Sequence, residues 1–233
     1  MPAQTLSADE IIRARRSIRR FLPTPVPLDA VREILDVAAR APSGTNVQPW
    51  KVYALAGAEK DALAQAIIEK NLASGAEPME FDYYPKQWVD PWLSRRRKVG
   101  IDMYGLLGIV KGDKETMTRQ WLRNYVFFDA PVGLIFTIDR IFGVGMLLDY
   151  GMFLQTLMLA ARARGLDTCT QLAFADYPQT IRRILDLPEN EKVICGMALG
   201  HADPDAPENQ QKTDRVPAGG FTEFRGFATP GED

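Results

Sequence analysis

The side chains best suited to bind a charged ligand lie close together near the N-terminus of this sequence. Arg15, Arg16, Ser17 and Arg19 fall within one short stretch. A phosphate accepts bidentate guanidinium contacts and a hydroxyl donor, and this stretch offers both. The alternative is a solvated helix end whose cations complement the helix dipole. The cluster therefore indicates an anion site, with a structural role as the competing interpretation.

A second polar stretch, residues 41–50, separates a predicted helix from a predicted strand. Six of its ten residues are turn formers, and a simple turn needs far fewer residues. Its candidate binding residues are Pro42, Ser43, Gly44, Asn46 and Gln48. Hydroxyl and amide groups on a proline-restricted backbone suit a planar ligand rich in amides. An ordinary helix-to-strand connection is the alternative.

Composition excludes several classes of protein. A net charge of −2 over 233 residues gives no electrostatic case for nucleic acid or membrane binding. Cys169 and Cys195 lie in apolar runs without metal or redox spacing, and His201 is the one histidine. The sequence therefore offers too few histidine and cysteine side chains for a His-based metal site, and a single histidine for a Ser-His-Asp triad. The N-terminus lacks the apolar stretch of a signal peptide, which predicts a cytoplasmic location.

Periodicity and capping signals place both polar stretches on predicted elements. Ser7 and Glu10 fit a capping box for a helix that runs into the arginines. Apolar residues at helical spacing predict a second helix from residue 28, which Pro42 ends. A strand at 50–55 and a more exposed helix at 58–70 follow the polar loop.

The middle of the chain differs from the rest in its amino-acid composition. From residue 71 to 91 it is rich in proline and aromatic residues, and helices are predicted at 93–110 and 113–127. One interpretation of residues 72–125 is an excursion packed onto the domain. The other is a lid, because aromatic side chains can stack on an aromatic ligand.

The C-terminal half contains the most apolar elements. An uninterrupted apolar run predicts a strand at 132–138 that is buried on both faces. Helix 146–164 is apolar around nearly its whole circumference, which places it at the domain centre or at a subunit interface. Strands are predicted at 166–173 and 192–201, with a helix between them that Asp176 caps.

Four motifs resemble those of the FMN-dependent nitroreductase family. They are R-x-S-x-[RK] at 15–19, P-S-[SG]-x-N-x-Q-P-W at 42–50, G-x-A-D-P at 200–204 and [KR]-x-x-R-x-P at 212–217. The resemblance implies a single α+β domain over residues 1–233, with a mixed central sheet flanked by helices. It also implies an intertwined homodimer with two FMN sites at its interface, in which the tail at 203–233 wraps the partner subunit.

The same resemblance assigns roles at the FMN site. The implied phosphate ligands are Arg15, Arg16, Ser17, Lys212 and Arg215. The pyrimidine edge needs amide donors and acceptors, which Asn46 and Gln48 offer, and by resemblance the turn at Gln171, Leu172 and Ala173 places backbone amides beside the reactive edge. Arg19 matches a cation near N1 and the C2 carbonyl, where it favours the reduced flavin. Relatives often carry lysine there, so arginine is expected to tune the potential differently.

The implied reaction leaves the hard chemistry to the flavin, so no catalytic side chain is predicted. NADH or NADPH reduces the flavin and leaves, and a nitroaromatic or quinone-like acceptor then takes its place. One shared site predicts ping-pong kinetics. The alternatives are another flavin reaction of the family, such as reductive dehalogenation, and a flavin carrier or sensor without turnover.

Overall fold

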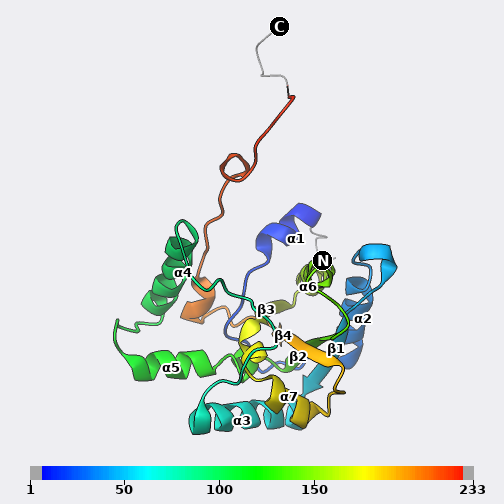
Figure 1. Cartoon of the computed structure of the whole chain (residues 1–233). Coiled ribbons are helices and arrows are strands. Elements are labelled where there is room, and N and C mark those ends of the chain that lie inside the picture. Colours follow the sequence, from blue (N-terminus) through cyan, green and yellow to red (C-terminus); the bar gives the residue numbers. More distant parts are fainter. Residues whose placement is uncertain (1–6, 228–233) are drawn as a thin grey trace, which may run out of the picture.

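The computed structural model describes residues 7–227 and places helices on both faces of one four-stranded sheet (Figure 1). The strands are β1 (Lys51–Ala56), β2 (Val132–Asp139), β3 (Asp167–Gln171) and β4 (Glu191–Gly200), in the order β1-β2-β4-β3. The helices are α1 (Ala8–Ala14), α2 (Leu28–Ala38), α3 (Gly57–Ser74), α4 (Trp92–Leu106), α5 (Lys114–Leu122), α6 (Met146–Ala163) and α7 (Pro178–Leu185). The predicted α+β class is confirmed.

The sheet differs from the prediction in the direction of its strands. All three pairings between the four strands are antiparallel. A mixed sheet would also contain parallel pairing. Within residues 7–227 the parallel pairing is a single bridge between Ser17 and Thr168. An apolar run indicates that both faces of a strand are covered but does not reveal the direction of its neighbours.

β2 is buried on both faces because different helices cover the two sides of the sheet. Leu134 and Phe136 pack into a core with α2 and α6, whereas Ile135 packs into a second core with α3 and α7. Successive side chains of a strand point to opposite faces, so neighbouring residues enter different cores. The apolar run at 132–138 is thereby explained.

Two helix starts show one confirmed and one wrong prediction. Ser7 caps α1 as predicted, since its hydroxyl accepts from the N–H of Glu10 and its own N–H donates to the Glu10 carboxylate at 2.7 Å. Asp176 does not cap α7. Instead the carboxylate of Glu77 accepts from the Thr180 N–H at 3.2 Å and from its hydroxyl at 2.6 Å. A cap supplied from a distant segment leaves no local sequence signal.

The helices of the middle segment, α4 and α5, end earlier than predicted. Gly108 and Gly112 adopt φ angles of +67° and +96° between the two helices, a conformation in which glycine is favoured. Beyond α5, Phe127, Phe128 and Asp129 also have positive φ. Local backbone conformation rather than apolar spacing therefore sets these helix ends.

α6 is covered on one side only within a single chain. Tyr150, Phe153 and Leu157 are buried against the sheet, while Leu148 is 75% and Met152 40% exposed. Among the described residues, no helix is both long and apolar enough to cross a bilayer. The exposed apolar face fits the subunit-interface alternative predicted from the sequence.

A buried carboxylate joins β1, β2 and β4 at one end of the sheet. Glu191 is 3% exposed and accepts from Tyr53 at 2.8 Å, from Thr137 at 2.6 Å and from the Lys51 ammonium. Burial alone would raise the pKa of Glu191, but these hydrogen bonds outweigh it and hold the pKa below its ordinary value.

Glu191→Gln is expected to lower the free energy of unfolding by about 1–3 kcal/mol at neutral pH. Because the folded-state pKa is depressed, the ionised group stabilises the fold above its unfolded pKa of about 4.3, and this stabilisation is lost as pH falls through the folded value. Denaturant titrations of both proteins should therefore converge at acid pH. Glu189→Gln, an exposed neighbour, is the control, and a pH-independent difference would contradict the assignment.

Candidate functional site

The arginine-serine segment is fixed to the sheet through one buried residue. Arg15 ends α1 in an extended conformation, and Ile18 is 1% exposed in the second core. The Ile18 N–H donates to the Thr168 carbonyl at 3.1 Å. In an extended segment alternate side chains point to opposite sides, so Ser17 and Arg19 face away from the residues that bury Ile18.

The C-terminal tail is held against this segment by Asn209, which is 4% exposed. Its carbonyl side-chain oxygen accepts from the Arg19 N–H at 2.8 Å, and its amide donates to the carbonyls of Arg20 and Asp203, both at 2.8 Å. The Asn209 backbone carbonyl accepts from Arg16 at 3.0 Å. Sequence reasoning did not find Asn209, because an isolated asparagine in a polar tail gives no signal of such a role.

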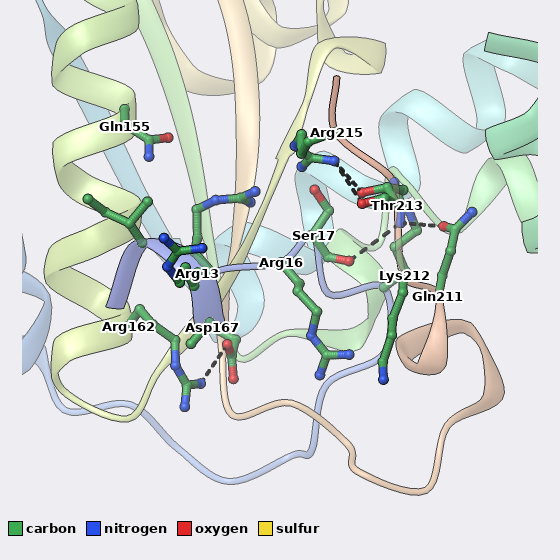
Figure 2. Close-up of a pocket in the computed structure, with 14 residues that line it drawn as sticks. Arg13, Arg16, Ser17, Gln155, Arg162, Asp167, Gln211, Lys212, Thr213 and Arg215 are labelled. Carbon is green, nitrogen blue, oxygen red and sulfur yellow. Dashed lines mark hydrogen bonds and ion pairs between the residues drawn. The ribbon is translucent and has the colours of Figure 1, made fainter. Parts of the chain in front are cut away.

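These contacts bring the two predicted phosphate-binding segments to one cavity of about 880 Å³ (Figure 2). Its cationic lining consists of Arg13, Arg15, Arg16, Arg19, Arg162, Lys212 and Arg215. Ser17 and Thr213 add hydroxyl groups. The predicted convergence of 15–19 with 212–215 is therefore observed, and Gln211 joins it through a 3.3 Å contact with Arg19.

The cavity carries a large excess of positive charge. Asp167 is the acidic residue in its lining, and that carboxylate already pairs with Arg162 at 2.8 Å. Burial lowers the pKa of Arg15, and repulsion from the Arg215 cation lowers it further. Cations that repel one another in a partly buried cavity favour an anionic ligand, and guanidinium and hydroxyl donors suit a phosphate.

A second cavity, of about 370 Å³, adjoins the first at Arg19, which lines both. Gln171, Leu172 and Ala173 line it where β3 ends. Its other lining residues come mainly from the middle segment and are Tyr83, Tyr84, Val99, Gly100, Met103, Tyr104, Gln120, Trp121, Asn124 and Phe128, with Cys169 and Thr170 from β3. Residues from 83 to 128 therefore wall a cavity, as the lid interpretation requires.

Gln171 is a buried polar residue of this second cavity. It is 2% exposed, and its side-chain amide donates to the Asn124 carbonyl at 2.6 Å. Its side-chain oxygen is buried and has no hydrogen-bond partner among the described residues. Such an orphaned acceptor is costly unless a ligand or water satisfies it.

The polar loop at 42–48 lies elsewhere and lines neither cavity of this chain. The Gly44 N–H donates to the Asp149 carboxylate of α6 at 3.0 Å, and the Gln48 N–H donates to the Ser43 hydroxyl at 3.0 Å. Thr45, Asn46 and Gln48 have positive φ, which shows a specified backbone rather than a loose connection. Asp149, which holds this loop, was not identified as a site residue from the sequence.

The chain is similar to known proteins over nearly its whole length. Residues 12–201 match the profile of the Nitroreductase family. A 4-nitrobenzoate reductase of Pseudomonas putida is 42% identical over 94% of this chain and 96% of its own length.

Solved structures give the same result. The crystal structure of the FMN- and NADPH-dependent nitroreductase NfnB from Sphingopyxis sp. strain HMH is 38% identical, with a TM-score of 0.92 over 95% of this chain and 100% of that one. The FMN-dependent nitroreductase NfnB from Mycobacterium smegmatis, solved in complex with NADPH, is 30% identical, with a TM-score of 0.89 over 93% and 97% of the two chains. Profile, relatives and fold agree: the chain belongs to the nitroreductase family.

Proposed function

We propose that this chain is an FMN-dependent oxidoreductase that uses a nicotinamide to reduce nitroaromatic acceptors. The observation that carries this function is the junction at Arg19 of a cationic cavity with an aromatic-lined one. FMN combines a phosphate with a planar ring system, so it needs both environments. The similar proteins whose names specify nitrobenzoate, FMN and NADPH support this assignment.

The described residues fit FMN. The proposed phosphate ligands are Arg15, Arg16, Ser17, Lys212 and Arg215, all of which line the cationic cavity. The unsatisfied side-chain oxygen of Gln171 offers an acceptor to a ring N–H. When bound, FMN takes two electrons from the nicotinamide and delivers them to the acceptor.

The walls of the second cavity suit a flat aromatic acceptor. Tyr84, Tyr104, Trp121 and Phe128 line it, and none of the residues that line it is acidic. Aromatic faces stack on an aromatic acceptor and exclude water from it. A nicotinamide ring is also flat, so donor and acceptor would occupy this cavity in turn, which predicts ping-pong kinetics.

We further propose a homodimer in which the partner's loop at 42–48 completes each FMN site. Within one chain this loop lines neither cavity, although Asn46 and Gln48 are the proposed ligands of the pyrimidine edge. The exposed face of α6 and the tail aromatics Phe221 and Phe224, which are 73% and 62% exposed, give such a dimer apolar surface to bury. The tail beyond residue 227 lies outside the described residues.

Leu148→Glu is expected to shift the dimer towards monomer and to release FMN in parallel. Leu148 is a 75% exposed apolar residue of α6, and an unpaired charge there would be desolvated on association. Light scattering measures the mass, and gel filtration with absorbance measures the flavin retained. Val110→Glu, 68% exposed in the link before α5, is the control. A monomer that keeps its FMN would exclude the shared site.

An acceptor screen on the yellow, FMN-loaded protein tests the function. NADH and NADPH are each supplied with 4-nitrobenzoate, a quinone or a halophenol. Steady nicotinamide consumption with the nitroaromatic, yielding hydroxylamine, is the expected result. Halide release without nitro reduction would favour the dehalogenase alternative, and flavin binding without consumption would favour a carrier or sensor. The cytoplasmic location stays a prediction.

A further inference from the structure

The loop at 75–91, which precedes α4, is firmly attached at its beginning. Glu77 caps α7 through two contacts with Thr180 and donates its N–H to the Asp176 carbonyl at 2.8 Å. The Glu80 carboxylate accepts from the Val193 N–H at 3.0 Å and lies 3.5 Å from the Arg182 guanidinium. These contacts fix the first part of the loop to α7 and β4.

The second part of the loop carries aromatic rings that are much less enclosed. Tyr83 and Tyr84 are 55% and 53% exposed, and both line the cavity proposed for the acceptor. Their ring centroids are 4.6 Å apart in an edge-to-face arrangement, and Trp88 lies 5.6 Å from Tyr84. Tyr83 and Tyr84 are exposed and Trp88 is half-buried, so contacts among these rings alone hold this cavity wall weakly. The position of the wall therefore depends on what else contacts the rings.

Arg96 of α4 supplies that contact. Its guanidinium carbon lies 5.1 Å from the Trp88 ring centroid and 5.5 Å from the Tyr84 centroid, within the range of a cation–π interaction. Val99 and Gly100, one helical turn further along α4, line the same cavity. Arg96 therefore joins the two walls of the cavity, the loop and the helix.

We propose that Arg96 is a positioning residue that sets the width of the acceptor cavity and thereby selects compact aromatic acceptors over bulky ones. This inference rests on the proposed function. Arg96 does not itself line the cavity; it acts through Tyr84 and Trp88. A planar guanidinium can face two rings at once. A lysine ammonium is a point charge, so its cation–π interaction with the two rings is expected to be weaker.

The test compares Arg96→Gln, Arg96→Lys and the control Arg95→Gln, an exposed neighbour on α4, all loaded with FMN. In ping-pong kinetics the kcat/KM of the acceptor reports on the acceptor half-reaction alone. The ratio of kcat/KM for 4-nitrobenzoate to that for a two-ring nitroarene should fall about three- to tenfold in Arg96→Gln, given two exposed cation–π contacts. Arg96→Lys should recover part of the ratio, and Arg95→Gln should leave it unchanged.

Two further measurements separate positioning from a general structural effect. The effect of Trp88→Leu combined with Arg96→Gln should be smaller than the sum of the two single effects, because both changes remove the contact between Arg96 and Trp88. The dissociation constant of benzoate, which cannot be reduced, should rise in Arg96→Gln and not in Arg95→Gln. Additive effects, or equal selectivity in the two Gln variants, would overturn the inference. A wild-type protein that binds benzoate but turns over no nitroaromatic would instead overturn the proposed function.

Discussion

Replacing Arg15 with alanine is expected to weaken FMN binding about ten- to a hundredfold. In the proposed FMN site the substitution would remove a charge-assisted hydrogen bond to phosphate, worth about 1.5–3 kcal/mol. It also removes one of two cations that repel each other, since burial and Arg215 both lower the pKa of Arg15. The free energy of unfolding of the FMN-free protein should therefore not fall, although FMN affinity does.

Fluorescence of released FMN measures the affinity, and denaturant unfolding of the FMN-free protein measures stability. Arg215→Ala should behave like Arg15→Ala. Arg32→Ala is the control, because that arginine lies on the surface of α2 and pairs with Asp29 at 3.2 Å. If both Arg15→Ala and Arg215→Ala retained wild-type affinity, the phosphate would have to bind elsewhere.

Arg19→Gln is expected to lower the midpoint potential of the bound flavin and to slow its reduction by NAD(P)H. Arg19 lines both cavities, and its backbone N–H is anchored by Asn209 at 2.8 Å. A fixed cation at this junction stabilises the anionic reduced form more than the neutral oxidised form. For a two-electron couple about 30 mV corresponds to about 1.4 kcal/mol, so the loss of one charge should be measurable.

Spectroelectrochemical titration gives the potential, and anaerobic stopped-flow gives the rate of reduction. Arg19→Lys keeps the charge and should stay closer to the wild-type potential than Arg19→Gln does. Affinity for oxidised FMN should change less in Arg19→Gln than in Arg15→Ala. A potential and a rate both unchanged in Arg19→Gln would show that this arginine only supports the tail, through Gln211 and Asn209.

Local signals predicted the elements well. Apolar periodicity and the Ser7 capping box located α1, α2 and α6, and the uninterrupted apolar run located β2. Contacts between distant segments were not predictable in the same way. Glu77 caps α7 across about a hundred residues of sequence, and the antiparallel sheet follows from tertiary pairing that no single strand specifies.

The candidate site shows the same division. Motifs matched to a family predicted that 15–19 and 212–215 would meet, and the structure brings them to one cavity. Asn209, which holds the tail in place, and Arg96, which holds the aromatic loop, lie outside those motifs. Their importance depends on burial and on ring contacts, which spacing along a sequence does not encode.

Anaerobic double-mixing tests most directly whether this chain passes electrons from a nicotinamide to a nitroaromatic. The FMN-loaded protein is first mixed with one equivalent of NADPH and then, after its yellow absorbance is lost, with 4-nitrobenzoate. The expected result is rapid recovery of the absorbance, at a rate that rises with 4-nitrobenzoate concentration, with formation of the nitroso compound, the product of a two-electron reduction. Recovery no faster than in buffer without the nitroaromatic would contradict the proposed function.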